Sequence, residues 1–223
     1  MKPLEAPSEV CSLLPSSSRV DLLERYAGWL AGPGIERGLL GPRERDRIWS
    51  RHLGNCALVE PLVAPTGSIC DLGSGAGLPG VVLAIARPDQ AVVLLEPLLR
   101  RSQFLAEVVD DLQLSNAEVV RARAEDYAST RPSHRTVVAR AVAPLDRLVG
   151  WALPLLRPGG ELLALKGTNA PSELADAGPA LDRAGVLDRE VIPLGRGGNV
   201  THAVRVVSPG LDHAGPEPAA EDR

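Results

Sequence analysis

The chain has 223 residues, of which 44% are hydrophobic and 23% are charged, and its formal net charge at pH 7 is −4. This composition is typical of a soluble globular protein with a sizeable core, and the charge does not indicate a general nucleic-acid-binding protein. No apolar run reaches the roughly 18 residues of a transmembrane helix, and the N-terminus lacks the apolar core of a signal peptide. We therefore expect a cytoplasmic protein without a membrane partner.

The two ends of the chain differ in composition from the middle. Residues 1–18 are polar and contain prolines, which predicts a flexible N-terminus. Residues 208–223 are rich in proline, glycine, alanine and acidic residues, which predicts a disordered acidic tail. Residues 19–207 then form a single predicted domain, with N-terminal helices over 19–66 and an α/β core over 67–207.

Two helices are predicted ahead of the core. Three serines offer N-caps for a helix over residues 19–31, and a Gly-Pro-Gly run ends it. A second helix begins at Pro42, because proline suits the first helical position, and apolar residues recur at helical spacing from Ile48 to Val63. This second segment carries a basic cluster, which consists of Arg43, Arg45, Arg47, Arg51 and His52.

From residue 68 onward, apolar strand-like runs alternate with helical patterns. The runs lie at 68–72, 91–95, 117–120, 136–139, 161–165, 187–192 and 203–207. The helical patterns lie near 79–87, 98–113, 144–156 and 171–184. This alternation predicts a mostly parallel sheet with helices on both faces. Only the sequence LGRGGN separates the last two runs, which favours an antiparallel hairpin at the sheet edge.

The turn after the first predicted strand, DLGSGAGLPG from Asp71 to Gly80, holds four glycines. Such a turn lets backbone N–H groups approach a nucleotide closely. Its spacing fits two patterns: the dinucleotide fingerprint, read from Gly75, and a methyltransferase pattern, read from the acid Asp71. Glu96 ends the second strand at the spacing of a ribose-binding acid in either case. The turn alone therefore leaves an NAD cofactor and a methyl donor both open.

Two further features favour the methyl donor. Small and acidic residues, Ala124 and Glu125, follow the third strand, where an adenine edge would be bound. The chain also lacks a second domain and a recognisable hydride-transfer constellation, which an oxidoreductase of this size would need.

At this point a specific resemblance appears. The strings ICDLGSGAGLPGVVLAIARP, LLEPLLRRSQFLAEV, RARAED, VVARAVAPL and LALKG occur in this order, and an Arg51-His52 pair precedes them. Together they resemble the bacterial small-subunit rRNA methyltransferase G family, also called glucose-inhibited division protein B, over residues 19–207. The resemblance implies a Rossmann-like class I methyltransferase fold with a seven-stranded sheet. It also implies S-adenosylmethionine as cofactor and, as substrate, N7 of a guanine in 16S rRNA near the decoding site.

The resemblance also implies a role for each matching residue. Gly73 and Leu78 would line the cofactor, and Glu96 would bind its ribose hydroxyls. The remaining implied cofactor residues are Asp71, Ser74, Gly75 and Gly77 in the turn, Ala124 and Glu125 near the adenine, and Arg140 on the fourth strand. The implied residues for positioning RNA or the target base are Arg51, His52 and Lys166.

The chemistry needs no general base, because guanine N7 already carries a free lone pair. No catalytic base and no metal site are therefore predicted; the histidines and the three widely spaced cysteines show no metal-ligand spacing. The expected partner is 16S rRNA within the small ribosomal subunit or an assembly intermediate, with no stable protein partner.

Several alternatives remain open from the sequence. The first alternative is a methyltransferase that acts on another methyl acceptor. The second is an NAD-dependent oxidoreductase, and the third is a protein that binds RNA without catalysis. Individual residues also have structural alternatives. In the structural interpretation, His52 is a buried helix histidine and Lys166 is a solvated strand end. Arg140 is then an ion-pair partner of Asp146 or Glu125.

Overall fold

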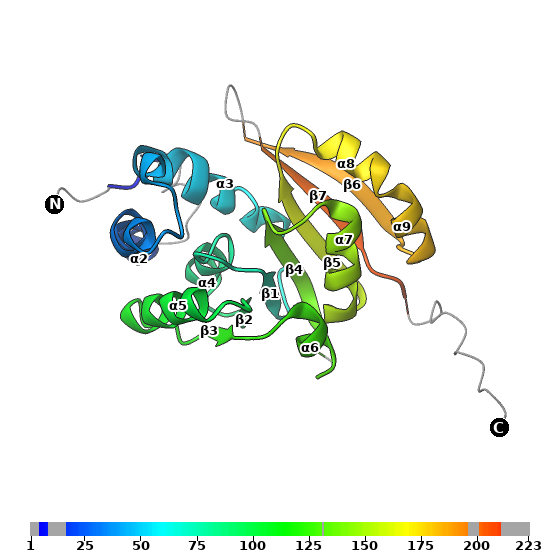
Figure 1. The fold of residues 1–223 in the computed structure, drawn as a ribbon, viewed down its shortest axis with the longest axis horizontal. Coiled ribbons are helices and arrows are strands. Elements are labelled where there is room, and N and C mark those ends of the chain that lie inside the picture. The colour runs from blue at the N-terminus through cyan, green and yellow to red at the C-terminus, as the bar shows by residue number, and fades with distance from the viewer. Residues whose placement is uncertain (1–4, 9–16, 131, 196–200, 211–223) are drawn as a thin grey trace.

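A computed structural model describes residues 5–8, 17–130, 132–195 and 201–210. Within these residues, seven strands form one sheet in the order β3-β2-β1-β4-β5-β7-β6 (Figure 1). The strands are β1 (Ile69–Leu72), β2 (Val92–Leu95), β3 (Ala117–Val120), β4 (His134–Arg140), β5 (Leu156–Lys166), β6 (Asp188–Leu194) and β7 (Thr201–Val207). All seven predicted strands are therefore present.

The pairing of the strands confirms the predicted mostly parallel sheet. Strand β1 pairs in parallel with β2 and β4, while β7 runs antiparallel to both β5 and β6. The predicted edge hairpin is thus present, with β6 at the edge. The strand order reverses at β1, between β2 and β4, and the carboxyl ends of strands at such a point form the usual ligand crevice of an open α/β sheet.

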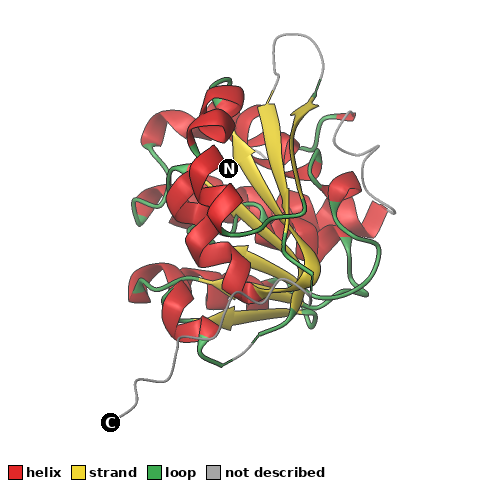
Figure 2. Cartoon of the chain, turned by 90° about the vertical axis from the view of Figure 1, so that its right-hand side faces the viewer, coloured by secondary structure: helices red, strands yellow, loops and turns green. Residues whose placement is uncertain are grey.

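Helices cover both faces of the sheet and bury two separate cores (Figures 1 and 2). The helices over the first core are α2 (Ser17–Trp29), α4 (Gly80–Ala86) and α5 (Leu99–Asp111). Those over the second core are α6 (Ala124–Ala128), α7 (Leu145–Ala152), α8 (Ala170–Asp176) and α9 (Gly178–Arg183). Neighbouring strand residues alternate between the cores: Ile69 lies in the first and Cys70 in the second.

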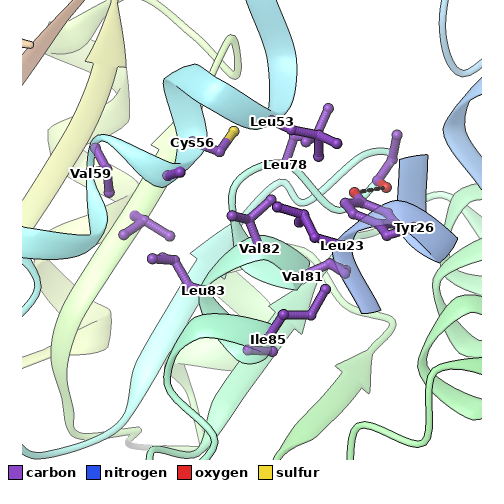
Figure 3. Close-up of a cluster of buried hydrophobic side chains, with 14 of the residues drawn as sticks. Leu23, Tyr26, Leu53, Cys56, Val59, Leu78, Val81, Val82, Leu83 and Ile85 are labelled. Carbon is purple, nitrogen blue, oxygen red and sulfur yellow. Dashed lines mark hydrogen bonds between the residues drawn. The ribbon is translucent and has the colours of Figure 1, made fainter. Parts of the chain in front are cut away.

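The N-terminal segment packs onto α4 and the turn after β1, as Figure 3 shows. Leu23 of α2 and Leu53 belong to the same buried cluster as Val82 of α4. The hydroxyl of Tyr26 donates a 2.7 Å hydrogen bond to the carbonyl of Ala76 within the turn. The N-terminal segment therefore holds the turn in place.

The second predicted helix, from Pro42 onward, is not continuous. Four short elements replace it: η2 (Pro42–Arg47), η3 (Ile48–Leu53), α3 (Gly54–Ala57) and η4 (Glu60–Leu62). Gly54 at the start of α3 and Pro61 in η4 disfavour a long regular helix, because glycine is conformationally free and proline lacks an N–H. The first helix also changes: α2 passes into a single π turn, η1 (Leu30–Gly34), which contains Pro33.

Other boundaries also differ from the predictions. The helix predicted over 171–184 is split into α8 and α9, because Pro179 cannot donate to a carbonyl of the preceding turn. The predicted helix over 144–156 ends earlier and is followed by a 3₁₀ turn, η5 (Leu153–Leu155). Helix α6 was not predicted, and β5 begins five residues before its predicted start.

The predicted chain ends are only partly within the described residues. The boundary predicted at 207 is too early, because Ser208 is buried and bonds to the carbonyls of Gly160 and Arg157. The rest of the predicted acidic tail, 211–223, lies outside the described residues. In the predicted flexible N-terminus, residues 1–4 and 9–16 also lie outside them, while the amide of Ala6 donates to Glu24. Within the described part of the chain, no helix has the length and apolar character needed to cross a membrane.

Candidate active site

The glycine-rich turn follows β1 and is bonded to the end of β2. The amides of Gly73 and Ser74 donate to the carbonyl of Leu95, at 2.8 and 3.1 Å. Gly77 has a φ of +99°, and a Cβ there would lie 2.6 Å from Val81 and 2.7 Å from the Tyr26 hydroxyl. Glycine is therefore required at Gly77 both for its backbone conformation and for its close packing.

The first two glycines of this turn, Gly73 and Gly75, differ in their surroundings. A Cβ at Gly73 would lie 2.9 Å from a methyl of Val142, which follows β4. The corresponding position at Gly75 is open, with only one backbone oxygen at 3.8 Å. The turn thus touches the segment after β4 at Gly73 and leaves space at Gly75. Leu78, predicted to line the cofactor, is almost fully buried and belongs to the first core.

Asp71 fixes the two ends of the turn from inside the protein. Its side chain is fully buried, and Oδ2 accepts a 2.9 Å hydrogen bond from the amide of Gly80. Oδ1 has no hydrogen-bond partner among the described residues. Burial raises the pKa of Asp71 to about 7, although the bond from Gly80 opposes this shift. The carboxyl group is therefore costly to ionise in the folded protein.

Glu96 lies at the end of β2 and bonds to the turn. Its carboxylate accepts hydrogen bonds of 2.9 Å from the amides of Gly75 and Leu98. Only 2% of the residue is exposed, and Arg101 lies 3.9 Å from one oxygen. Each carboxylate oxygen can accept a second hydrogen bond, so this arrangement is compatible with the ribose contact expected of Glu96.

The predicted adenine region lies at the start of α6. Ala124 is buried against the second core, while Glu125 is exposed. Both follow β3, which pairs with β2 next to the turn. The positions expected around a nucleoside are therefore supplied by the carboxyl ends of three adjacent strands.

A cavity of about 670 Å³ opens at the carboxyl ends of β4 and β5. Its polar lining includes Arg51, Asn55, Arg140, Lys166, Glu173 and Thr201. Three residues predicted from the sequence, Arg51, Arg140 and Lys166, are thus brought to one place. Val142 also lines the cavity and connects it to the glycine-rich turn at Gly73.

Lys166 is held firmly at the edge of this cavity. Its Nζ donates to the carbonyl of Ala143 at 2.9 Å and to Glu173 at 2.6 Å. Only 10% of its side chain is exposed, so Lys166 is not the solvated strand end of the structural alternative. Glu173, on α8, was not among the predicted site residues.

Arg140 contacts the N-terminal segment. One terminal nitrogen lies 2.6 Å from Nδ1 of His52, and the other donates to Sγ of Cys56 at 3.4 Å. The alternative ion pair with Asp146 or Glu125 is wrong, because among the described residues the side-chain partners of Arg140 are His52 and Cys56. The guanidinium therefore links the end of β4 to the helical segment that carries Arg51.

His52 is a buried histidine with both ring nitrogens bonded. Its Nε2 lies 2.7 Å from Glu44, and its side chain is only 8% exposed. Burial lowers the pKa of His52, and the charge of Arg140 adds to this effect. In this arrangement His52 presents no free ring nitrogen to RNA. His52 does not line the cavity itself, but it is bonded to Arg140, which does.

Sequence reasoning did not identify Glu44 and Cys56 as part of this site. Glu44 lies eight residues before His52 across a break between η2 and η3, so no helical spacing relates the two. No group of three or more metal-ligating side chains occurs in the described residues.

The sheet order and the glycine-rich turn define a Rossmann-like class I methyltransferase fold. A solved S-adenosylmethionine-dependent O-methyltransferase from Thermotoga maritima shares this fold, with a TM-score of 0.54 and 14% identity. The match covers 70% of this chain and 65% of that one.

The family follows from closer comparisons. The model of the family described as rRNA small subunit methyltransferase G matches residues 19–195. Ribosomal RNA small subunit methyltransferase G of Nocardioides sp. is 53% identical over 91% of this chain and 82% of its own length. That of Thermobifida fusca is 57% identical over 82% of this chain and 77% of its own length. The chain belongs to the rRNA small subunit methyltransferase G family. This membership does not favour the oxidoreductase alternative.

Proposed function

We propose that this chain transfers a methyl group from S-adenosylmethionine to N7 of a guanine in 16S rRNA near the decoding site. The observation that carries the proposal is the convergence of Arg51, Arg140 and Lys166 on one cavity beside the glycine-rich turn. The relatives' shared name, ribosomal RNA small subunit methyltransferase G, supports small-subunit rRNA as the substrate class. The substrate is the small ribosomal subunit or an assembly intermediate of it.

The residues around the turn fit the proposed cofactor. The open space at Gly75 admits a ligand close to the backbone, and the carboxylate of Glu96 can accept hydrogen bonds from ribose hydroxyls. When bound, S-adenosylmethionine supplies an electrophilic methyl group on a positively charged sulfur. Gly73, Gly75 and Glu96 would hold the nucleoside, with Ala124 and Glu125 near the adenine.

The reaction requires positioning more than acid–base chemistry. Guanine N7 accepts hydrogen bonds through a lone pair and needs no deprotonation before it attacks a methyl group. Alignment of two reactants can lower a barrier by roughly 7–11 kcal/mol. The task of this chain is therefore to hold the guanine base in line with the methyl group.

The cations of the cavity suit this task if they contact the RNA away from N7. The methylated guanine carries a positive charge, so a cation placed against N7 would oppose the reaction. We assign Arg51 to a phosphate, since 58% of its side chain is exposed. Lys166 and Arg140 would contact a phosphate, guanine O6 or the carboxylate of the cofactor.

The proposal is tested by methyl transfer to purified small subunits. Subunits from cells lacking this protein are incubated with the protein and labelled S-adenosylmethionine, and the modified nucleotide is located by mass mapping. We expect one guanine of 16S rRNA to gain one methyl group at N7. Subunits from cells that contain the protein are the control and should accept little label. Label on another molecule or at another base position would contradict the proposal.

Two further arms address the substrate form and the cofactor. Deproteinised 16S rRNA should accept less methyl than intact subunits, because the guanine must be presented in a folded context. Calorimetry should show binding of S-adenosylhomocysteine and no comparable binding of NAD. Tight binding of NAD alone would restore the oxidoreductase alternative.

A further inference from the structure

Three side chains, two from the N-terminal segment and one from β4, form a line of hydrogen bonds that ends in the cavity. Glu44 lies in η2, His52 in η3, and Arg140 at the end of β4. The carboxylate of Glu44 lies 2.7 Å from Nε2 of His52, and Nδ1 of His52 lies 2.6 Å from a terminal nitrogen of Arg140. Arg140 lines the cavity, whereas His52 is buried behind it.

The chemistry of arginine determines the protonation of the ring. A guanidinium group has only donors, so Nδ1 of His52 must accept its hydrogen bond through a lone pair. In a neutral imidazole the proton then resides on Nε2, where it is donated to Glu44. The hydrogen-bond partners thus define the neutral Nε2–H tautomer of His52.

The charges around the ring also favour this neutral form. Among the described residues, the charged groups that act on His52 are Glu44 of η2, Arg51 of η3 and Arg140 of β4. Burial and the two arginines lower its pKa, and Glu44 raises it by a smaller amount. A proton on Nδ1 would remove the acceptor of Arg140 and place a second positive charge beside the guanidinium.

We propose that Glu44 and His52 are positioning residues that hold the guanidinium of Arg140 at the wall of the cavity. Glu44 orients the ring, and Nδ1 of the ring fixes one terminal nitrogen of Arg140. The bond to Cys56 holds the other, so the remaining N–H groups are available to the substrate or cofactor. This inference rests on the proposed function, because it assigns the cavity to methyl transfer.

The tautomer of His52 gives a test that does not depend on activity. The chain has four histidines, so nitrogen-15 NMR of labelled protein, with His52→Asn to assign the signal, resolves this ring. We expect a neutral Nε2–H ring at pH 7 in the wild-type protein. A ring with its proton on Nδ1, or a doubly protonated ring, would overturn the proposal.

Two substitutions of His52 separate its two hydrogen bonds. In His52→Asn, the side-chain oxygen takes the place of Nδ1 and can still accept from Arg140. In His52→Gln, the amide nitrogen takes the place of Nε2 and retains only the contact with Glu44. Loss of a hydrogen bond to a charged group predicts a fall in kcat/KM of about tenfold or more for His52→Gln. His52→Asn should retain most of the activity, and equal losses in both variants would overturn the proposal.

Glu44→Gln tests whether Glu44 acts through the ring. This substitution should lower kcat/KM for subunits in the wild-type background and have little further effect in the His52→Asn background. Equal effects in both backgrounds would show that Glu44 acts independently of His52. His134→Asn is the matched control, because His134 is also buried and hydrogen-bonded but lies at the opposite end of β4.

The pH profile supplies a second test of the hydrogen bonds from Glu44 through His52 to Arg140. In the wild-type protein, kcat/KM should fall at acidic pH as His52 becomes protonated and releases Arg140. This acidic limb should be absent in His52→Asn and unchanged in His134→Asn; an acidic limb that persists in His52→Asn would overturn the proposal. If the wild-type protein methylates no rRNA, the proposed function fails. The NMR measurement then tests by itself whether Nδ1 of His52 accepts a hydrogen bond from Arg140.

Discussion

The backbone amide of Gly75 donates a 2.9 Å hydrogen bond to the carboxylate of Glu96. This bond joins the turn after β1 to the end of β2. Because the second oxygen of Glu96 accepts from the amide of Leu98, the carboxylate organises the backbone on both sides of the proposed cofactor site. Glu96, which is expected to bind the ribose, therefore also fixes the backbone of the glycine-rich turn next to the proposed cofactor site.

Glu96→Gln should weaken cofactor binding without unfolding the protein. The side-chain amide of glutamine has one N–H₂ donor, which would face the backbone amide of Gly75 or Leu98, so one of these two hydrogen bonds would be lost. The substitution also removes the negative charge. Loss of one hydrogen bond to a charged group predicts about tenfold to hundredfold weaker binding of S-adenosylhomocysteine by calorimetry. Glu118→Gln is the control, because Glu118 is an exposed carboxylate on the neighbouring strand β3. Unchanged affinity in Glu96→Gln would remove Glu96 from the cofactor site.

Gly77→Ala should destabilise the protein strongly. Its φ of +99° disfavours an L-residue, and the new Cβ would clash with Val81 and the hydroxyl of Tyr26. We expect the free energy of unfolding in urea to fall by about 2 kcal/mol or more. Gly150→Ala is the matched control on α7, where a Cβ meets nothing within 4 Å, and it should stabilise the helix by roughly 0.5–1 kcal/mol. A similar effect at both positions would contradict the packing described for the turn.

The main features of the fold could be predicted because they depend on local patterns. Apolar runs of strand length and the glycine-rich turn identify an alternating α/β core without any tertiary information. Breaks within helices were harder to predict. Pro179 splits a helix whose apolar spacing continues across it, and α6 has only five residues, too few to show a helical period.

The site could be predicted only in part, for a related reason. Arg140 and Lys166 end adjacent parallel strands, so their meeting at one edge of the sheet follows from the strand order. The contact between His52 and Arg140 joins residues 88 positions apart, and it depends on how the N-terminal segment packs against β4. No spacing within the sequence encodes that packing. The partners Glu44 and Cys56 therefore became apparent only in three dimensions.

Arg51→Ala should weaken the use of RNA and leave cofactor binding unchanged. The side chain is largely exposed, and its ion-pair partner among the described residues is Glu44, at 3.4 Å, so its loss costs the fold little. If Arg51 contacts a phosphate, the KM for subunits should rise, and the slope of log affinity against log salt should decrease by about 1. Arg157→Ala is the control, since Arg157 is exposed near the amino end of β5, far along the strand from Lys166. A large loss of S-adenosylhomocysteine binding in Arg51→Ala would place Arg51 in the cofactor site instead.

Glu173→Gln should strengthen the use of RNA. Glu173 is the partner of Lys166 at 2.6 Å and adds a negative charge to a cavity proposed to receive a polyanion. A partly exposed ion pair contributes up to about 1 kcal/mol, so the KM for subunits should decrease by up to about fivefold. Asp176→Asn removes the same charge from the exposed face of α8 and should change KM less. An increase of KM in Glu173→Gln would mean that Glu173 orients Lys166 for catalysis.

Asp71→Asn should change the pH dependence of stability in a defined direction. The pKa of Asp71 is about 7 in the folded protein, whereas an aspartate in an unfolded chain titrates near 4. Between these values the folded state binds more protons than the unfolded state, so the contribution of Asp71 to stability falls as the pH rises. Asparagine can still accept from the amide of Gly80 and does not ionise. The variant should therefore gain stability relative to the wild type by about 1.4 kcal/mol for each pH unit in this window.

Urea unfolding of both proteins from pH 4.5 to 8 measures this difference. The lowered pKa values of His52 and His134 act in the opposite direction, because a histidine buried in its neutral form favours the folded state as the pH rises. These contributions are common to both proteins and cancel in the difference. The difference should grow up to about pH 7, the folded-state pKa of Asp71, and then become constant. A difference that does not vary with pH would mean that Asp71 titrates normally and that its buried oxygen Oδ1 has a partner in solution, such as water.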